Sequence, residues 1–196
     1  MSEAWVRFRK SMAAGFEQWH DGVGYDLDAL PGMTAEERNS VSREIRMRLA
    51  NAGRAPDWRD MEAADALGLT DCLEALREHG DAEVRLRAAR YLGEADEVES
   101  ALCEALRGED ASAASQALDS VSEYPSGRVR QAVIALLKRV DENFVNAGFV
   151  ALEVFGGVAD AMTERPFLFE VQEQGPDGPL MDRLIARVSG SGKSRD

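Results

Sequence analysis

The chain of 196 residues is poor in the residue types that form metal and redox sites, with two cysteines and two histidines. Cys72 and Cys103 are too few for the disulfide framework of a small secreted domain. Both lie in apolar helical patterns, so we expect two separate buried thiols. His20 and His79 each lie at the expected end of a helix, where the helix dipole favours a cation. None of these spacings is that of a metal site, and we expect no cofactor.

Long apolar runs are also missing. No stretch of about 18 apolar residues is present to span a bilayer, and no apolar segment near the N-terminus resembles a secretory signal. We therefore expect a cytoplasmic protein. With 44% hydrophobic and 30% charged residues, the composition is typical of a globular protein.

Basic residues are outnumbered, with 23 Lys and Arg against 36 Asp and Glu, a net charge of −13. Much of the excess lies in residues 54–140, which hold eleven basic and eighteen acidic residues, a net of −7. This charge repels a nucleic-acid backbone and an anionic membrane, so we expect neither as the main partner. A basic protein partner is favoured.

Motifs for phosphate, calcium or catalysis are lacking too. Gly22–Gly24 has neither the strand-then-helix frame nor the lysine of a phosphate loop. Asp21, Asp26 and Asp28 lack the spacing and the terminal glutamate of an EF-hand. The sequence therefore predicts no catalytic residue and no metal ligand.

What the chain has is helical periodicity, best formed in Asp81–Arg107. Two short amphipathic helices are expected there, at 82–92 and 97–106, each with one apolar stripe at helical spacing. A pair of helices this short cannot bury its apolar faces alone. It therefore implies stacked neighbours.

The same pattern recurs with a period near thirty. Asp81, Asp110 and Asp141 are 29 and 31 residues apart, and each is expected to cap a helix N-terminus. A small residue follows each at +7, namely Ala88, Ala117 and Gly148, where two helices could approach closely. An earlier unit is expected from residue 55, because residues 60–68 align with residues 85–93 and end in the same glycine. About four units result.

The first helix of the second unit reads D-A-E-V-R-L-R-A-A-R-Y-L-G from Asp81 to Gly93. This resembles HEAT-like α-helical repeats, whose first helix often reads D-x-x-V-R-x-x-A-A-x-x-L-G. The resemblance covers about residues 55–155 and weakens in the last two units. The arrangement as a whole is also similar to small bacterial HEAT-like proteins with a helical N-terminal cap. It implies an all-α, right-handed α-solenoid of about four helix pairs, and it bears on fold rather than activity.

The expected organisation is a single continuous domain with a helical cap (1–53), HEAT-like repeats (54–157), an irregular C-terminal cap (158–188) and a disordered tail (189–196). The first cap should hold a helix at 3–19 and another that begins at a Thr34–Glu37 capping box and runs to about Asn51. In the last cap, the residue before Pro166 favours an extended step over 163–166. Residues 167–171 are expected as a short extended piece or a buried turn, and Pro179 should begin the last helix.

In HEAT-like arrays the second helices usually line the concave face, so their outward charged residues are the candidate partner-binding set. These are Asp71, Glu74, Glu78, Glu97, Glu104 and Arg130. A competing interpretation is a solvated face of i,i+4 ion pairs.

Three function classes follow from these features. The first is a non-catalytic protein-binding scaffold, in one version an immunity protein that inhibits a cationic toxin such as a nuclease. The second is an enzyme similar to the HEAT-like proteins that act on alkylated DNA bases, which the negative charge disfavours. The third is an adaptor or chaperone for a cofactor protein, similar to HEAT-like pigment lyases.

Overall fold

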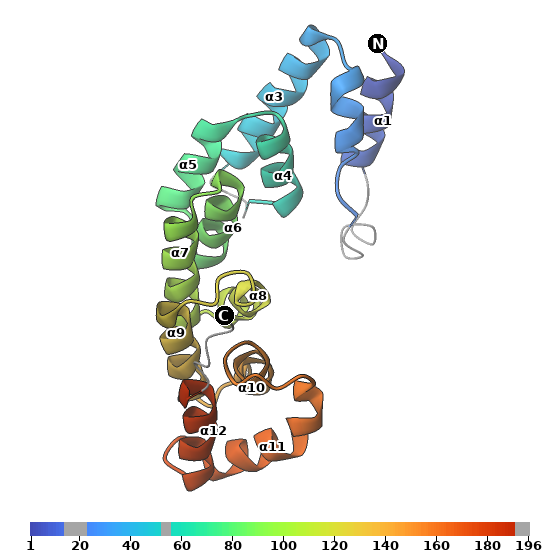
Figure 1. Cartoon of the computed structure of the whole chain (residues 1–196). Coiled ribbons are helices and arrows are strands. Elements are labelled where there is room, and N and C mark those ends of the chain that lie inside the picture. Colours follow the sequence, from blue (N-terminus) through green and yellow to red (C-terminus); the bar gives the residue numbers. More distant parts are fainter. Residues whose placement is uncertain (14–22, 52–55, 191–196) are drawn as a thin grey trace, which may run out of the picture. The chain divides into compact units, whose positions relative to one another are not determined.

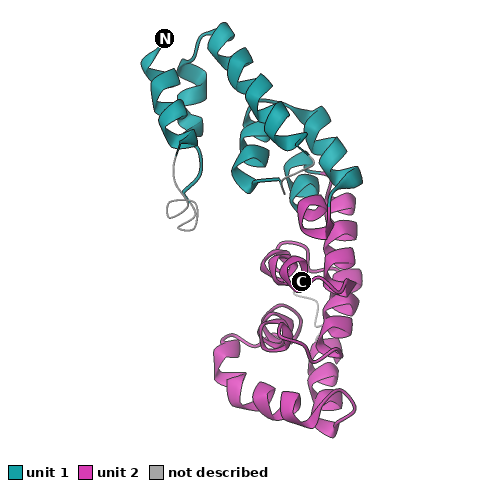
Figure 2. Cartoon of the chain, turned by 180° about the vertical axis from the view of Figure 1, so that it is seen from behind, with its two compact units in different colours: residues 1–80, 87–93 teal, residues 81–86, 94–196 magenta. Residues whose placement is uncertain are grey.

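The computed structural model describes residues 1–13, 23–51 and 56–190. All regular structure in these ranges is helical, with no strand, which confirms the all-α prediction (Figure 1). The chain divides into two compact units (Figure 2). Unit 1 comprises residues 1–80 and 87–93, and unit 2 comprises residues 81–86 and 94–196. The division falls within one helix, α6 (Ala82–Leu92).

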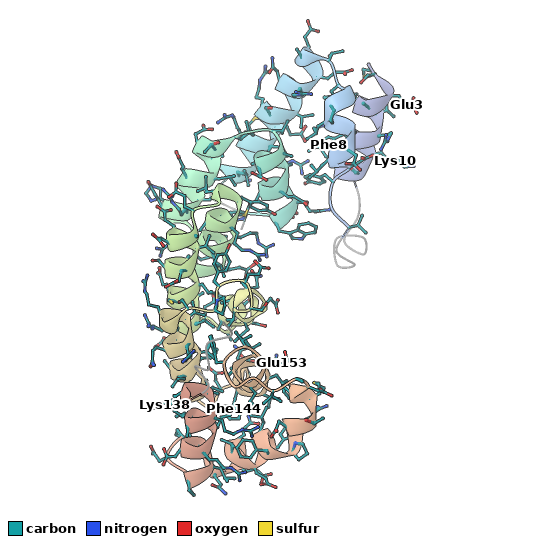
Figure 3. The ribbon with its side chains drawn as sticks, in the orientation of Figure 1. Glu3, Phe8, Lys10, Lys138, Phe144 and Glu153 are labelled. Carbon is teal, nitrogen blue, oxygen red and sulfur yellow. The ribbon has the colours of Figure 1, made fainter. Side chains whose placement is uncertain are left out.

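In its described residues, unit 1 contains five helices and the last part of α6. They are α1 (Glu3–Met12), η1 (Leu27–Gly32), α3 (Ala35–Leu49), α4 (Trp58–Ala66), α5 (Thr70–His79) and α6 (Ala82–Leu92). Helix α1 packs on η1, and α4 packs on both α3 and α5. Phe8 points inward from α1, whereas Glu3 and Lys10 point outward (Figure 3). The Phe8 ring meets the Tyr25 ring edge-on, with centroids 5.8 Å apart.

The predicted N-terminal helices are largely present. The Thr34–Glu37 capping box is confirmed, because Thr34 accepts the Glu37 amide and the Glu37 carboxylate accepts the Thr34 amide. Helix α3 ends at Leu49, two residues before the predicted end. Helix α1 ends at Met12, and most of the remainder of the predicted 3–19 helix lies outside the described residues.

Unit 2 contains the first turns of α6 and then a continuous series of short helices. They are α7 (Ala95–Arg107), α8 (Ala111–Ser120), α9 (Gly127–Leu137), α10 (Phe144–Val150), the π-helix η2 (Ala151–Phe155), η3 (Ala161–Glu164), α11 (Arg165–Gln174) and α12 (Pro179–Gly190). Helix α7 packs on α8 and α9, and α10 packs on α8, α9 and α11. Phe144 is buried and Lys138 is exposed (Figure 3).

Contacts between alternate helices of unit 2 join residues about thirty positions apart. Between α7 and α9, the Arg128 guanidinium lies 3.4 Å from a Glu99 carboxylate oxygen, and Arg139 donates to the Arg107 carbonyl at 3.2 Å. Helices α6, α8 and α10, the first helices of successive pairs, show the same offset. Ser112 donates to Glu83 at 3.1 Å, and Asn143, directly before α10, donates to the Ala111 carbonyl at 3.0 Å. The repeat length of about thirty residues in the sequence is therefore also the spacing between residues that contact each other. Helices α7 and α9 run in the same direction.

Two of the three predicted aspartate caps are confirmed. Asp81 accepts the Val84 amide at 2.9 Å, and Asp110 accepts the amides of Ser112 and Ala113. The prediction for Asp141 is wrong, because α10 begins only at Phe144. Asp141 instead accepts the Asn143 amide at 2.9 Å, and so it stabilises the turn that precedes the helix.

The prediction of extended structure in residues 163–171 is also wrong. Residues 161–164 form η3, and residues 165–174 form α11. Pro166 lies in the first turn of α11, where an amide has no intrahelical acceptor and its loss costs nothing. Leu168 and Val171 are buried at helical spacing, and this burial stabilises the helix. Helix α12 begins at Pro179, as predicted.

Candidate functional site

The predicted acidic residues of α5 form one exposed stripe. Asp71, Glu74 and Glu78 are spaced at i, i+3 and i+7, which places them on one side of the helix. The side chains of Asp71 and Glu78 are 65% and 61% exposed. Their exposure follows from local sequence, because Leu73 supplies the buried side of the same helix. Three carboxylates of unit 1 therefore face solvent together.

Asp71 is the member of this stripe that pairs with an arginine, whereas Glu78 has only the His79 imidazole, 3.8 Å away. The Arg46 guanidinium of α3 forms an ion pair with Asp71 and also donates to the Cys72 Sγ atom at 3.4 Å. The hydrogen bond from Arg46 lowers the pKa of Asp71 below its usual range. Within the described part of the chain, Glu74 has no ion-pair partner. Glu74 and Glu78 therefore contribute most of the attraction for a cation.

The two cysteines differ in burial. Cys103 is buried, as predicted, but Cys72 is only half-buried, because its helix also carries the exposed acidic stripe. Burial raises the pKa of both thiols. Raised pKa values keep both groups protonated near neutral pH, and so they disfavour thiolate chemistry at either position.

The other three predicted residues belong to unit 2. On α7, Glu97 is half-buried and Glu104 is exposed, and Glu104 pairs with Arg85 of α6. On α9, Arg130 is half-buried, with its guanidinium 5.2 Å from the Phe155 ring centroid. Its Nε atom is buried without a hydrogen-bond partner. Arg130 therefore packs against η2, while Arg128 of α9 and Lys138, directly after α9, are exposed.

The six predicted residues thus form two sets. Asp71, Glu74 and Glu78 lie together on α5 in unit 1, and the remaining three lie on α7 and α9 in unit 2. The set in unit 1 is uniformly acidic and exposed. The set in unit 2 combines two carboxylates with one arginine, and Glu104 and Arg130 already contact other side chains. The α5 stripe is the stronger candidate for a cation-binding surface.

A buried charged cluster in unit 1 was not predicted. The Tyr25 hydroxyl donates to Asp60 at 2.8 Å, and Arg48 donates to the Tyr25 oxygen at 3.1 Å. Arg59 pairs with Asp57 at 2.8 Å and lies 5.2 Å from the centroid of the Tyr25 ring. Burial raises the pKa of Tyr25, and the hydrogen bond to Asp60 raises it further. The phenol therefore stays protonated.

This cluster positions helices rather than reaching solvent. Asp60 is 2% exposed and Arg59 is 7% exposed, so neither can contact a substrate without rearrangement. Through Arg48 and Tyr25 the cluster ties α3 and the segment before η1 to the start of α4. The only sequence signal for it is the charged run at 57–60, which has the same composition as an exposed first helical turn.

Within the described ranges, no group of three or more His, Cys, Asp and Glu side chains is arranged to hold a metal ion. None of the helices described here has both the length and the apolar character needed to cross a membrane. Comparison with known proteins gives no match to a family model, to a curated protein or to a solved structure.

Proposed function

We propose that this chain is a non-catalytic protein-binding scaffold whose acidic surface binds a basic protein. The observation that carries the proposal is the exposed stripe of three carboxylates on α5, in a chain of net charge −13. Such a surface attracts a cationic partner at long range and raises its association rate. It repels nucleic acid and anionic lipid in the same way.

We also propose that the helices form a right-handed α-solenoid of HEAT-like pairs. The contacts of unit 2 support this, since α7 with α9 and α8 with α10 meet at an offset of about thirty residues. In a repeat array each unit contacts its neighbours through equivalent positions. A repeat scaffold presents side chains from successive helices on a broad surface, which suits a protein partner better than a small molecule.

The concrete biological version is an immunity protein that inhibits a basic toxin in the cytoplasm. A toxin that binds nucleic acid needs a cationic surface, and an acidic scaffold can cover that surface. The size and charge of this chain are consistent with the role. Glu74 and Glu78 are the residues that would contact the cationic surface first. Both are exposed, and their charges are not paired with an arginine as that of Asp71 is.

The test is affinity capture from an extract of the source organism at about 50 mM and about 300 mM salt, a range over which exposed charge pairs become screened. We expect the unaltered chain to retain a basic protein at low salt. The variant Glu74→Arg/Glu78→Arg should retain much less of it. Glu109→Arg, an exposed reversal on the other unit, is the matched control and should retain the normal amount.

Two results would contradict the proposal. One is the absence of any retained basic protein at low salt. The other is a retained protein whose amount is the same for the unaltered chain and the α5 double variant. Retention of duplex DNA that carries alkylated bases would instead favour the enzyme class.

A further inference from the structure

Helix α11 is packed on one side only. Leu168 and Val171 are buried against the rest of unit 2, where α10 and α12 are the neighbours of α11. The opposite side carries exposed residues at helical spacing, and Figure 1 shows α11 at the edge of unit 2. They are Arg165, Pro166, Phe169, Glu170, Glu173 and Gln174. We call these six residues the outer face of α11.

The outer face has an apolar centre and opposite charges at its two ends. Phe169, at its centre, is 43% exposed. Arg165 lies one turn before Phe169, with its guanidinium 5.5 Å from the ring centroid. Glu173 lies one turn after it.

Arg165 and Glu173 cannot neutralise each other within the helix. Eight residues separate them, which is a rise of about 12 Å. Among the residues that the structure describes, neither has an ion-pair partner. Both charges are therefore available to a second molecule, at equal sequence distances from Phe169.

This symmetry points to one partner: we propose that the outer face of α11 binds the same face of a second copy of the chain. In a two-fold antiparallel pair centred on Phe169, a residue four positions before the centre faces a residue four positions after it. Arg165 of each copy then faces Glu173 of the other, and the two Phe169 rings meet at the axis. The charges of Arg165 and Glu173 complement each other twice, and the exposed part of each Phe169 ring becomes covered.

The contact is small, so the association should be weak. One helix of ten residues per copy buries less than the roughly 1,000 Å² that a stable interface usually needs. A dissociation constant on the order of 100 µM is the expected range. The inference does not rest on the proposed binding of a basic protein, because it uses a different surface.

The test is sedimentation equilibrium of the full chain from about 5 µM to about 1 mM, a range that brackets such a dissociation constant. We expect a reversible monomer–dimer equilibrium. Phe169→Asp, Arg165→Glu and Glu173→Arg should each weaken dimerisation at least about tenfold, the charge reversals because like charges then face each other. The double variant Arg165→Glu/Glu173→Arg should return to within about threefold of the unaltered chain, because the facing charges are again opposite.

In the double variant position 165 is a glutamate, so any local contact of Arg165 with the Phe169 ring stays lost. Recovery of dimerisation in that variant would therefore come from the contact between the two copies. Glu109→Arg is the control reversal and should leave dimerisation unchanged, and circular dichroism should show the same helix content for every variant. A chain that is monomeric at all concentrations would overturn the inference. So would a dimer that Phe169→Asp leaves intact, which would use another surface, or a double reversal that restores nothing.

Discussion

Gly148 of α10 and Leu168 of α11 approach so closely that a β-carbon at position 148 would lie 2.6 Å from the Leu168 Cδ2 atom. Real β-carbons do not tolerate such a contact, so the two helices depend on glycine at this position. The repeat pattern predicts a small residue here, and the structure shows the close approach that the pattern implies. Ala88 and Ala117, the aligned residues, are fully buried.

Gly148→Ala should therefore destabilise the protein by about 1–3 kcal/mol, the usual cost of overpacking a core. Chemical denaturation measures the change. The double variant Gly148→Ala/Leu168→Ala should lose less than the sum of the two single changes, because the clash is removed. Simple additivity of the two losses would show that the two residues do not interact.

Ser120 is fully buried, and its hydroxyl oxygen has no hydrogen-bond partner. Ser120→Ala should stabilise the protein by about 1 kcal/mol, because it removes an unsatisfied polar group from the core. Thermal denaturation gives the comparison. The matched control is Ser126→Ala, which removes the side chain that accepts the Val129 amide at the start of α9 and should cost about 1 kcal/mol. A loss of stability in Ser120→Ala would mean that the hydroxyl has a partner.

Val140 has a φ of 52°, a conformation that is unfavourable for a β-branched residue. Val140→Gly should raise stability by up to about 1 kcal/mol, the relief of strain being offset by the freedom of glycine in the unfolded chain. The reverse comparison is Gly93→Ala. Gly93 has a φ of 74° and free space around its Cα atom, so that change should cost about 1 kcal/mol through strain alone. Denaturant midpoints with unchanged slopes would verify both values.

The repeat helices could be predicted because their signals are local. The caps at Asp81 and Asp110 and the capping box at Thr34 act within four residues of the chain, and the structure contains all three. Helix α11 was missed because the residue before Pro166 was expected to be extended. That rule does not hold in a first helical turn that buried Leu168 anchors against another helix.

The candidate site was predictable only in part, for the same reason. The exposure of Glu74 follows from the stripe of its own helix. The half-burial of Arg130 depends on Phe155, which lies 25 positions later in a π-helix that no local signal marks. The buried cluster joins Tyr25, Arg48 and Asp60, three residues that are distant in sequence, and only the tertiary fold brings them together.

Glu37 should make stability depend on acid pH. It accepts the Ser2 hydroxyl and amide, each at 2.7 Å, and these bonds, followed by the Thr34 amide at 3.0 Å, lower its pKa to about 2. A lowered folded-state pKa contributes stability that is fully present above the unfolded pKa of about 4.3 and is lost as the pH falls towards 2. The melting temperature of Glu37→Gln should therefore lie below that of the unaltered chain at pH 6, and the difference should shrink between pH 4 and pH 2. A constant difference across this range would show that the carboxylate charge is not involved.

Arg59 and Asp57 form a buried ion pair, with side chains only 9% and 4% exposed. Arg59→Ala should destabilise the protein by about 3 kcal/mol, because Asp57 would keep a buried charge without this partner. Arg7→Ala is the matched control: Arg7 also binds an aspartate, Asp26, through two nitrogens, but its side chain is 55% exposed. Exposed pairs contribute at most about 1 kcal/mol. Urea denaturation should therefore separate the two variants by at least about 2 kcal/mol. Equal losses would mean that water reaches Asp57, and the cluster would then be an accessible site rather than a structural one.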